Sequence, residues 1–356
     1  MHTTNHYKII AVCALLIVQT FTLSAQTTVY PAPEKVAADF KALLSRPVVA
    51  PNPSFTITKS DDVIIEKGTI NSEANEKVPT LIYKPATGKK NYPVVVFLHG
   101  TGGSKDSKEI TDVLYSLTKL GIMGVAIDAR YHGERVNGGA HGGTEYTNAA
   151  YAAWKNTDPA KQTHPFLYDT AYDLWRLVDY LVTRPDVQAD RIGMSGISMG
   201  GMETWMAAAV DKRIKVLVLN ISVQSFKWSL DNDKWQGRAG TIKQAHQQVA
   251  HDLGDADWNK TNVKTLWDKL IPGITGEFDC PSMIRLLAPR PLLVLSNEKD
   301  QNCPLPGALI AFDSAKAAYA SQNAGDKLKM DVAANEPHRS TPPHIQMTLD
   351  WFAKWL

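Results

Sequence analysis

The chain has 356 residues, 44% of them hydrophobic and 21% charged, and its 38 basic and 36 acidic residues give a formal net charge of +2. This length allows one large or two modest domains, and it is enough to bury a full hydrophobic core without disulfides or metals. The balanced charge argues against a nucleic-acid-binding protein with a basic stripe and against a disordered acidic segment. Three cysteines are too few for a four-cysteine zinc site.

The first 25 residues have the pattern of an export signal. A cation at Lys8 precedes the apolar run 9–18, and the small residues Ser24 and Ala25 follow. We expect cleavage after Ala25 and a secreted or periplasmic protein. The apolar run is shorter than the ~20 residues that span a bilayer, so we expect no membrane contact after cleavage. An N-terminal anchor that is never cut is the alternative.

Residues 26–75 are expected to form an N-terminal arm, with a short helix at 34–45 and strands at 55–58 and 63–67. From residue 76 to 356, short apolar runs alternate with amphipathic segments. The predicted strands are 78–84, 92–98, 122–127, 191–194, 214–219, 291–295 and 328–332, and the predicted helices are 109–120, 170–183, 199–210, 308–320 and 343–356. This alternation predicts an α/β domain with a doubly wound, mostly parallel sheet and helices on both faces.

Two long segments, 132–169 and 221–287, interrupt the alternation, and each follows a predicted strand. Structureless loops longer than ~15 residues are uncommon in compact domains, so we expect lid insertions over the carboxyl edge of the sheet, where open α/β sheets bind ligands. The second insertion has a helical pattern at 241–253. It also holds four tryptophans that either wall a substrate pocket or pack a lid helix: Trp228, Trp235, Trp258 and Trp267.

The segment Gly196-Ile197-Ser198-Met199-Gly200 has the G-x-S-x-G pattern. This pattern places a nucleophilic serine on a sharp turn between a strand and a helix, and glycines are needed where strand and helix pass close together. A predicted strand precedes Ser198 and a predicted helix follows it. Ser198 is therefore the expected nucleophile. The alternative is a structural turn in which Ser198 only caps the helix.

The acid and the base are expected to follow the serine in that order along the chain. His338 lies six residues past the last predicted strand, in a loop from which an imidazole can reach the serine, and His344 is the alternative base inside the closing helix. Asp300 lies five residues past the preceding predicted strand, and Glu298 is the alternative acid. We expect a Ser198–His338–Asp300 triad, in which the acid fixes the imidazole tautomer.

A glycine-rich loop, His99-Gly100-Thr101-Gly102-Gly103, follows the predicted strand 92–98. Such a loop can turn a backbone N–H toward a substrate carbonyl, so we expect Thr101 N–H and Met199 N–H to form an oxyanion hole. His99 and Gly102 are expected to line the substrate pocket. The alternative is an ordinary tight turn between strand and helix.

The charged segment 128–135 follows the predicted strand 122–127. Arg130 and His132 are expected to line the pocket, unless the loop is instead tied down by a pair between Asp128 and an arginine. The nearest second histidine is His141, at no regular ligand spacing, so we expect no metal, and the sequence gives no other cofactor signal.

Loss of the signal would remove Cys13 and leave Cys280 and Cys303. An exported protein favours a disulfide between them, and two buried thiols are the alternative. Cys303 lies three residues past Asp300, so a bridge would brace the loop of the acid.

From about residue 78 to 356, the chain resembles the serine α/β-hydrolase superfamily, in the branch of dienelactone-hydrolase-like, prolyl-oligopeptidase-like and acetyl xylan esterase-like enzymes. The resemblance rests on HGTGG at 99–103, DARYHGER at 128–135, RIGMSGISMGG at 191–201, APRPLLVLSNEKD at 288–300 and PHRSTPPHIQMTLDWF at 337–352. It implies the α/β-hydrolase fold and a secreted serine esterase. The implied substrate is a small-molecule or saccharide ester, including acyl or acetyl esters of carbohydrates.

Two other functions stay open. One is a serine peptidase of the prolyl-oligopeptidase type, although the fewer than ~60 residues before the hydrolase core leave no room for a β-propeller of ~40–45 residues a blade. The other is a non-catalytic binding protein on a hydrolase scaffold, since fold does not fix function. The sequence assigns no oligomeric state.

Overall fold

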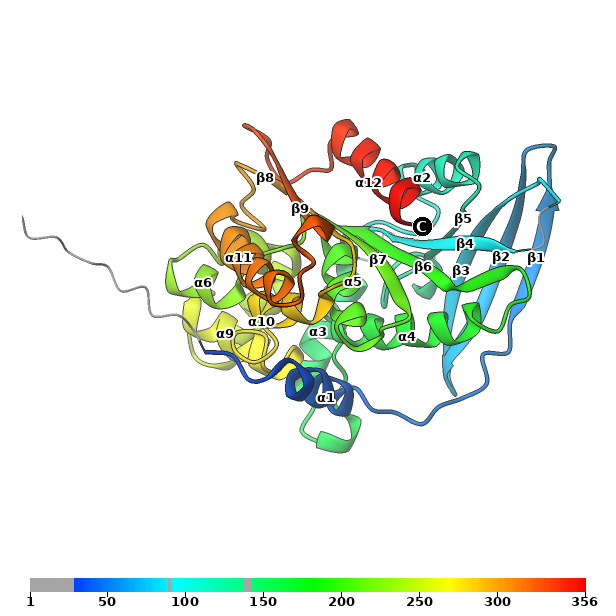
Figure 1. The fold of residues 1–356 in the computed structure, drawn as a ribbon. Helices are drawn as coiled ribbons and strands as arrows, with labels where there is room; N and C mark the ends of the chain where they lie inside the picture. The colour runs from blue at the N-terminus through cyan, green and yellow to red at the C-terminus, as the bar shows by residue number, and fades with distance from the viewer. Residues whose placement is uncertain (1–28, 89–90, 137–142) are drawn as a thin grey trace, which may run out of the picture.

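The computed structural model describes residues 29–88, 91–136 and 143–356 (Figure 1). The expected export signal at 1–25 and His141 lie outside these residues. Among the helices of the described ranges, none has the length and apolar character needed to cross a bilayer.

In the described part of the chain, nine strands form one sheet in the order β1-β2-β3-β5-β4-β6-β7-β8-β9. The first three strands pair antiparallel, and β3 pairs antiparallel with β5. All later pairs are parallel. The strands are β1 (Ser54–Lys59), β2 (Val63–Glu73), β3 (Glu76–Pro85), β4 (Tyr92–Leu98), β5 (Met123–Ile127), β6 (Val187–Ile197), β7 (Ile214–Asn220), β8 (Leu292–Asn297) and β9 (Leu328–Ala333). The predicted mostly parallel α/β sheet is confirmed, and β1 and β2 extend it.

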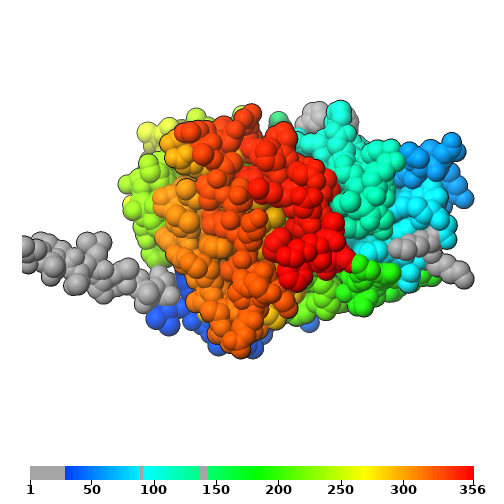
Figure 2. All heavy atoms as spheres, turned by 45° about the horizontal axis from the view of Figure 1, so that its top comes forward, coloured from blue at the N-terminus to red at the C-terminus, as the bar shows by residue number. Residues whose placement is uncertain are grey.

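Helices cover both faces of the sheet because its central strands are apolar on both sides. All seven residues of β4 are buried. Val95 and Phe97 of this strand pack toward α2 (Lys108–Lys119) and α12 (Pro342–Trp355), which lie side by side on one face (Figures 1 and 2). Val94 and Val96 pack toward the other face, with α1 (Pro33–Leu43), α4 (Tyr168–Leu181), α5 (Met199–Val210) and α11 (Leu305–Ser321). A short turn of helix, η5 (Gly325–Lys327), precedes β9.

The two predicted insertions contain short helices. The first holds η1 (Gly133–Arg135), α3 (Gly143–Lys155) and η2 (Pro159–Lys161), and the second holds α6 (Phe226–Asp231), α7 (Gln236–Ala239), η3 (Gly240–Ile242), α8 (Lys243–Asp252), α9 (Lys260–Leu270), α10 (Cys280–Met283) and η4 (Ile284–Leu287). Helix α3 packs against α8 and α9. Tyr151 Oη and Trp154 Nε1 of α3 donate to the Asp252 carboxylate of α8 at 3.2 and 2.9 Å. The two insertions therefore form one packed unit.

Candidate active site

Ser198 occupies the turn between β6 and α5, with φ 53° and ψ −109°. A positive φ is strained for a residue with a side chain, and such strain is typical of a nucleophile turn. The glycines around it are required by contact. A Cβ on Gly196 would lie 2.3 Å from the carbonyl carbon of Gly200, and a Cβ on Gly200 would lie 2.7 Å from His99 O. The G-x-S-x-G spacing thus lets strand and helix pass at backbone contact distance.

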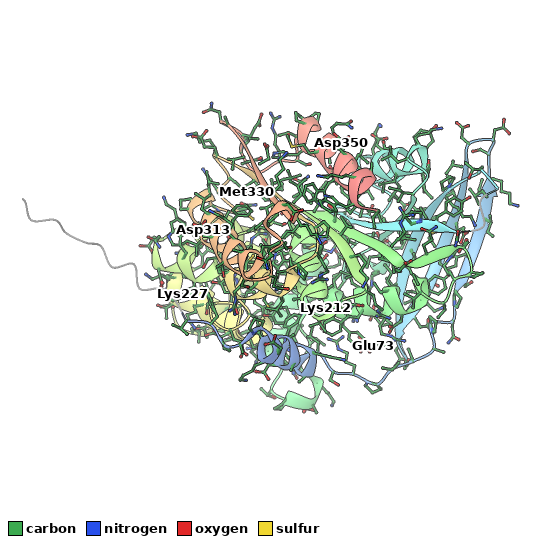
Figure 3. The ribbon with its side chains drawn as sticks, viewed as in Figure 1. Glu73, Lys212, Lys227, Asp313, Met330 and Asp350 are labelled. Atoms are coloured by element: carbon green, nitrogen blue, oxygen red, sulfur yellow. The ribbon has the colours of Figure 1, made fainter. Side chains whose placement is uncertain are left out.

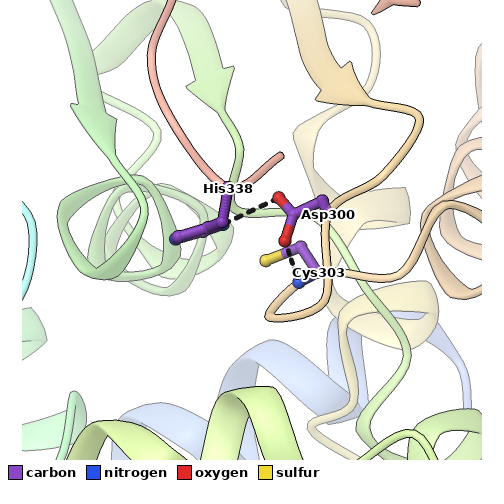
Figure 4. A group of neighbouring side chains, drawn as sticks. All are labelled: Asp300, Cys303 and His338. Atoms are coloured by element: carbon purple, nitrogen blue, oxygen red, sulfur yellow. Dashed lines mark hydrogen bonds and ion pairs between the residues drawn. The ribbon is translucent and has the colours of Figure 1, made fainter. Parts of the chain in front are cut away.

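His338 lies between Ser198 and Asp300. Its Nε2 is 2.7 Å from Ser198 Oγ, and its Nδ1 is 2.7 Å from Asp300 Oδ2 (Figure 4). With the ionised carboxylate accepting from Nδ1–H, Nε2 is left to accept the serine proton, which is the tautomer a general base needs. The Asp300 side chain is 1% exposed and the His338 side chain is 19% exposed. Solvent therefore reaches the base but not the acid.

Two backbone amides hold the Asp300 carboxylate in place. Its Oδ1 accepts from Asn302 N at 2.8 Å and from Cys303 N at 2.7 Å, so Oδ2 faces the imidazole. The alternative residues lie elsewhere. His344 is buried in the first turn of α12, 3.2 Å from Asp331, and the exposed Glu298 accepts from Asn335 N.

The glycine-rich loop passes beside the nucleophile. Gly103 N donates to Gly100 O at 3.0 Å, and a Cβ on Gly100 would lie 3.7 Å from Ser198 Cβ. Gly102 has φ 81°, a conformation that suits glycine. Thr101 at the tip of this turn is half-buried. The loop is thus placed where a backbone N–H can reach the carbonyl of an ester held at Ser198.

His99 braces this loop from behind. Its Nδ1–H donates to Gly100 O at 2.8 Å, and its Nε2 accepts from Ala129 N at 3.1 Å. Burial lowers the pKa of His99 to about 4, so the ring is neutral. Because both nitrogens bind inside the protein, His99 connects the loops after β4 and β5 and leaves no nitrogen for a ligand.

Asp128 fastens the same two loops together. Its carboxylate accepts from Lys105 N at 2.8 Å, from Lys105 Nζ at 3.0 Å and from Glu134 N at 2.9 Å. Arg130, expected in the pocket, instead directs its guanidinium to Asp173 and to Glu73, which ends β2 (Figure 3). Charges do tie this loop down, but not through the expected pair: the Asp128 carboxylate binds Lys105 rather than an arginine, and Arg130 binds Asp173 and Glu73.

His132 is fully buried. Its Nδ1–H donates to Arg130 O at 2.8 Å, and its ring packs edge-on against Tyr146 of α3. Burial, followed by the neighbouring His99, lowers its pKa to about 4. His132 therefore joins the loop after β5 to the first insertion, and it is not exposed to a ligand in this structure.

The tryptophans of the second insertion pack among helices. Trp235 is buried and meets Trp258 edge-to-face at a centroid distance of 5.1 Å. Trp228 is half-buried on α6, where a Cβ on Gly307 of α11 would lie 3.3 Å from its ring. These contacts agree with the packing interpretation and give no evidence of a pocket wall.

Cys280 and Cys303 are free, buried thiols, so the expected bridge between them is not formed. Cys303 Sγ has other partners: it donates to Ile221 O at 3.2 Å and lies 3.0 Å from Arg238 Nη2. Among the described residues, Cys303 Sγ, an Asp300 oxygen and a His338 nitrogen lie within 4.8 Å of one another, a set that could ligate a metal. The guanidinium beside the sulfur disfavours a cation there.

Sequence reasoning missed two residues of the site. Asn220, the last residue of β7, accepts from Ser198 N through its carbonyl at 2.9 Å, and its Nδ2 donates to Ser340 Oγ at 2.9 Å. Its position could have been predicted, because a polar residue at the carboxyl end of the strand beside the nucleophile strand can bind the loops that carry the nucleophile and the base. Arg238 carries no sequence signal, since it lies in the four-residue helix α7.

Comparisons with known proteins agree with this geometry. A family model described as glucuronyl esterase of fungi matches residues 69–322, more than half of the chain. YtaP of Bacillus subtilis (strain 168), provisionally named a hydrolase, is 28% identical over 316 residues, 85% of this chain and 92% of YtaP.

Three solved structures share the fold. Acetyl xylan esterase 1 from Thermoanaerobacterium sp. JW/SL YS485 has a TM-score of 0.65 at 18% identity, covering 92% of this chain and 96% of its own. A glucuronoyl esterase from Solibacter usitatus has a TM-score of 0.60 at 17% identity, covering 91% and 92%. The methylesterase BT1017 has a TM-score of 0.64 at 18% identity, and the match covers 90% of this chain but only 63% of the methylesterase.

Proposed function

Because this chain belongs to the glucuronyl esterase family and is therefore a carboxylic ester hydrolase, we propose that it cleaves carbohydrate esters through Ser198, His338 and Asp300. The observation that carries this proposal is the pair of 2.7 Å contacts that His338 makes, one to Ser198 Oγ and one to Asp300 Oδ2.

The proposed reaction follows from these contacts. Ser198 Oγ attacks the ester carbonyl carbon while His338 Nε2 takes the hydroxyl proton, and the Asp300 carboxylate stabilises the imidazolium that forms. The negative charge on the carbonyl oxygen is met by Thr101 N–H and Met199 N–H. The imidazolium then protonates the leaving alcohol. Water, deprotonated by His338, attacks the acyl-enzyme and releases the acid and Ser198.

The substrate class rests on the family. The matching family model covers both Ser198 and Asp300, and its description is glucuronyl esterase of fungi. We therefore place the ester on the carboxyl group of a sugar acid, with an acetyl ester on a sugar hydroxyl as the second candidate, since an acetyl xylan esterase shares the fold over 92% of the chain. A secreted or periplasmic location after loss of residues 1–25 belongs to the same proposal, because these residues have the pattern of an export signal.

The test compares three substrates: benzyl glucuronate ester, acetylated xylan and a proline-containing peptide anilide. We expect hydrolysis of the glucuronate ester, and a loss of at least about 10⁴-fold in kcat for Ser198→Ala. Ser195→Ala is the matched control, because Ser195 is buried in β6 three residues earlier and its Oγ has no hydrogen-bond partner among the described residues. It should keep activity.

Each alternative has its own outcome. Preference for acetylated xylan would move the substrate class to acetyl esters, and preference for the anilide would indicate a peptidase. If Ser198 neither hydrolyses an ester nor reacts with a fluorophosphonate in the wild-type protein, the triad assignment is wrong and a binding role replaces it.

A further inference from the structure

Arg238 is a buried arginine that lies behind the proposed catalytic acid. It belongs to α7 in the second insertion and is 1% exposed. Within the described residues, none of its nitrogens forms an ion pair with a carboxylate. Burying a guanidinium without a counter-charge is costly, so the groups that surround this side chain indicate what it does there.

Two contacts connect the Arg238 guanidinium to the loop of the acid. Nη2 lies 3.0 Å from Cys303 Sγ, and the thiol donates onward to Ile221 O at 3.2 Å. The Gln224 side chain makes the second connection. In the amide orientation that satisfies both neighbours, its oxygen accepts from Arg238 Nε at 3.1 Å and its nitrogen donates to Asn302 O at 2.8 Å.

The backbone of α7 packs against the same acid loop. A Cβ on Gly237 would lie 2.2 Å from Gln301 O and 2.8 Å from Asn302 Oδ1, so only glycine fits at this contact. Helix α7 therefore touches three consecutive residues, Gln301, Asn302 and Cys303. Two of them, Asn302 and Cys303, supply the N–H groups that hold Asp300 Oδ1.

The guanidinium also brings a positive charge close to the acid and the base. Cys303 Sγ is within 4.8 Å of an Asp300 oxygen and of a His338 nitrogen (Figure 4), and Arg238 Nη2 lies 3.0 Å from the same sulfur. The Arg238 guanidinium therefore reaches the acid loop through the Cys303 sulfur.

We propose that Arg238 is a positioning residue that holds the acid loop, and with it the Asp300 carboxylate, through Cys303 and Gln224. The proposal deepens the proposed function, on whose assignment of the acid and base it rests. It gives the second insertion a role in the reaction without any contact to the substrate.

The other charged groups near the base are paired among themselves. In the same loop, Arg339 binds Glu336 at 2.6 Å. Lys299, next to the acid, pairs with Glu298 at 3.3 Å, and His344 of α12 binds Asp331 at 3.2 Å. Each of these pairs has at least one partly exposed side chain, whereas Asp300, Cys303 and Arg238 are all buried.

The test is the separate measurement of kcat and KM for Arg238→Gln and Arg238→Lys. We expect kcat of Arg238→Gln to fall about tenfold with little change in KM, because the Asp300 carboxylate that orients His338 is held less firmly while substrate binding is not touched. Arg238→Lys should recover part of the lost kcat, because an ammonium keeps one donor but lacks the second.

Arg290→Gln is the matched control. Arg290 is also a largely enclosed arginine, but its guanidinium donates only to backbone carbonyls, those of Ala208, Asp211, Ile214, Leu286 and Leu287. Its loss should lower the melting temperature and leave kcat near the wild-type value. A fall of kcat in Arg290→Gln equal to that in Arg238→Gln would overturn the proposal, because it would show a general effect of instability.

A second readout does not depend on the substrate. The His338 Nδ1 proton, assigned by its loss in His338→Gln, can be observed by proton NMR in the resting protein, where it reports the hydrogen bond to Asp300 Oδ2. We expect this resonance to shift or broaden in Arg238→Gln; an unchanged resonance overturns the proposal even if no ester is hydrolysed. Should Arg238→Gln fail to fold, Cys303→Ala tests the connection: a few-fold lower kcat at unchanged KM supports it, and wild-type kcat refutes it.

Discussion

His338 Nε2 lies 2.7 Å from Ser198 Oγ, although the two residues are 140 positions apart in the chain. The contact exists because β6 and β9 end at the same edge of a parallel sheet, so the loops that follow them meet there. The loop after β8 brings Asp300 to the same place. The geometry of the sheet thus assembles three distant residues without any local sequence motif joining them.

Asp300→Asn should lower kcat by about 10⁴-fold while leaving the fold intact, because an amide at this position no longer enforces the Nδ1–H tautomer of His338. The measurement is steady-state hydrolysis of the preferred ester. Glu298→Gln is the control, since the exposed Glu298 binds only Asn335 N and Lys299. A larger loss in Glu298→Gln than in Asp300→Asn would reverse the assignment of the acid.

Gly196→Ala should destabilise the protein strongly. The new Cβ would lie 2.3 Å from the backbone carbon of Gly200, and a backbone atom cannot move aside as a flexible side chain can. We expect the free energy of unfolding to fall by about 3 kcal/mol or more, read from urea denaturation. Gly240→Ala, where a Cβ meets nothing within 4 Å, should change it by less than about 1 kcal/mol. Equal effects of the two variants would contradict the close approach at the nucleophile turn.

His246 should make the fold sensitive to acid. It is fully buried in α8, and desolvation lowers its pKa to about 3 from an ordinary value of 6.5. Between these two pH values the unfolded chain binds a proton that the folded chain does not, so this residue's contribution to stability is present above pH 6.5 and is lost as the pH falls toward 3. At pH 4.5 the loss amounts to about 2–3 kcal/mol.

His246→Leu removes this loss, so its free energy of unfolding should fall less between pH 7.5 and 4.5 than that of the wild type. The slope that remains would come from other groups, including buried His99 and His132. Equilibrium urea unfolding at the two pH values gives the comparison. His251→Leu, an exposed position on the same helix, should keep the wild-type slope. If both variants behave alike, His246 is not the group responsible.

Reducing agents should change neither activity nor melting temperature, because Cys280 and Cys303 are free thiols. Burial raises the pKa of the Cys303 thiol to about 12, which also makes it slow to react in the folded state. Alkylation followed by mass spectrometry should therefore modify both cysteines in urea without prior reduction, and neither in buffer. A denatured protein that resists alkylation until it is reduced would show that the two sulfurs are bridged.

The sequence allowed prediction of the sheet and of the positions of Ser198, Asp300 and His338, because each lies in the turn or loop that follows a strand and the ends of parallel strands converge. It did not allow prediction of side-chain partners. Arg130 lies in a loop next to the site, yet its guanidinium binds Glu73 and Asp173, which are 57 and 43 positions away. The separation of Cys280 and Cys303 depends likewise on how two distant loops pack, and no local pattern encodes it.

Asn220 has a consequence for how the site opens. Its carbonyl binds the amide of Ser198, and its side chain binds Ser340 in the loop of the base, so one residue is attached to both. The base loop has a further attachment, because Asn297 Nδ2 donates to Pro337 O and Arg339 O. A displacement of Asn220 would therefore free the Ser198 amide for hydrogen exchange and remove one attachment of the base loop, while Asn297 still holds the residues on both sides of His338.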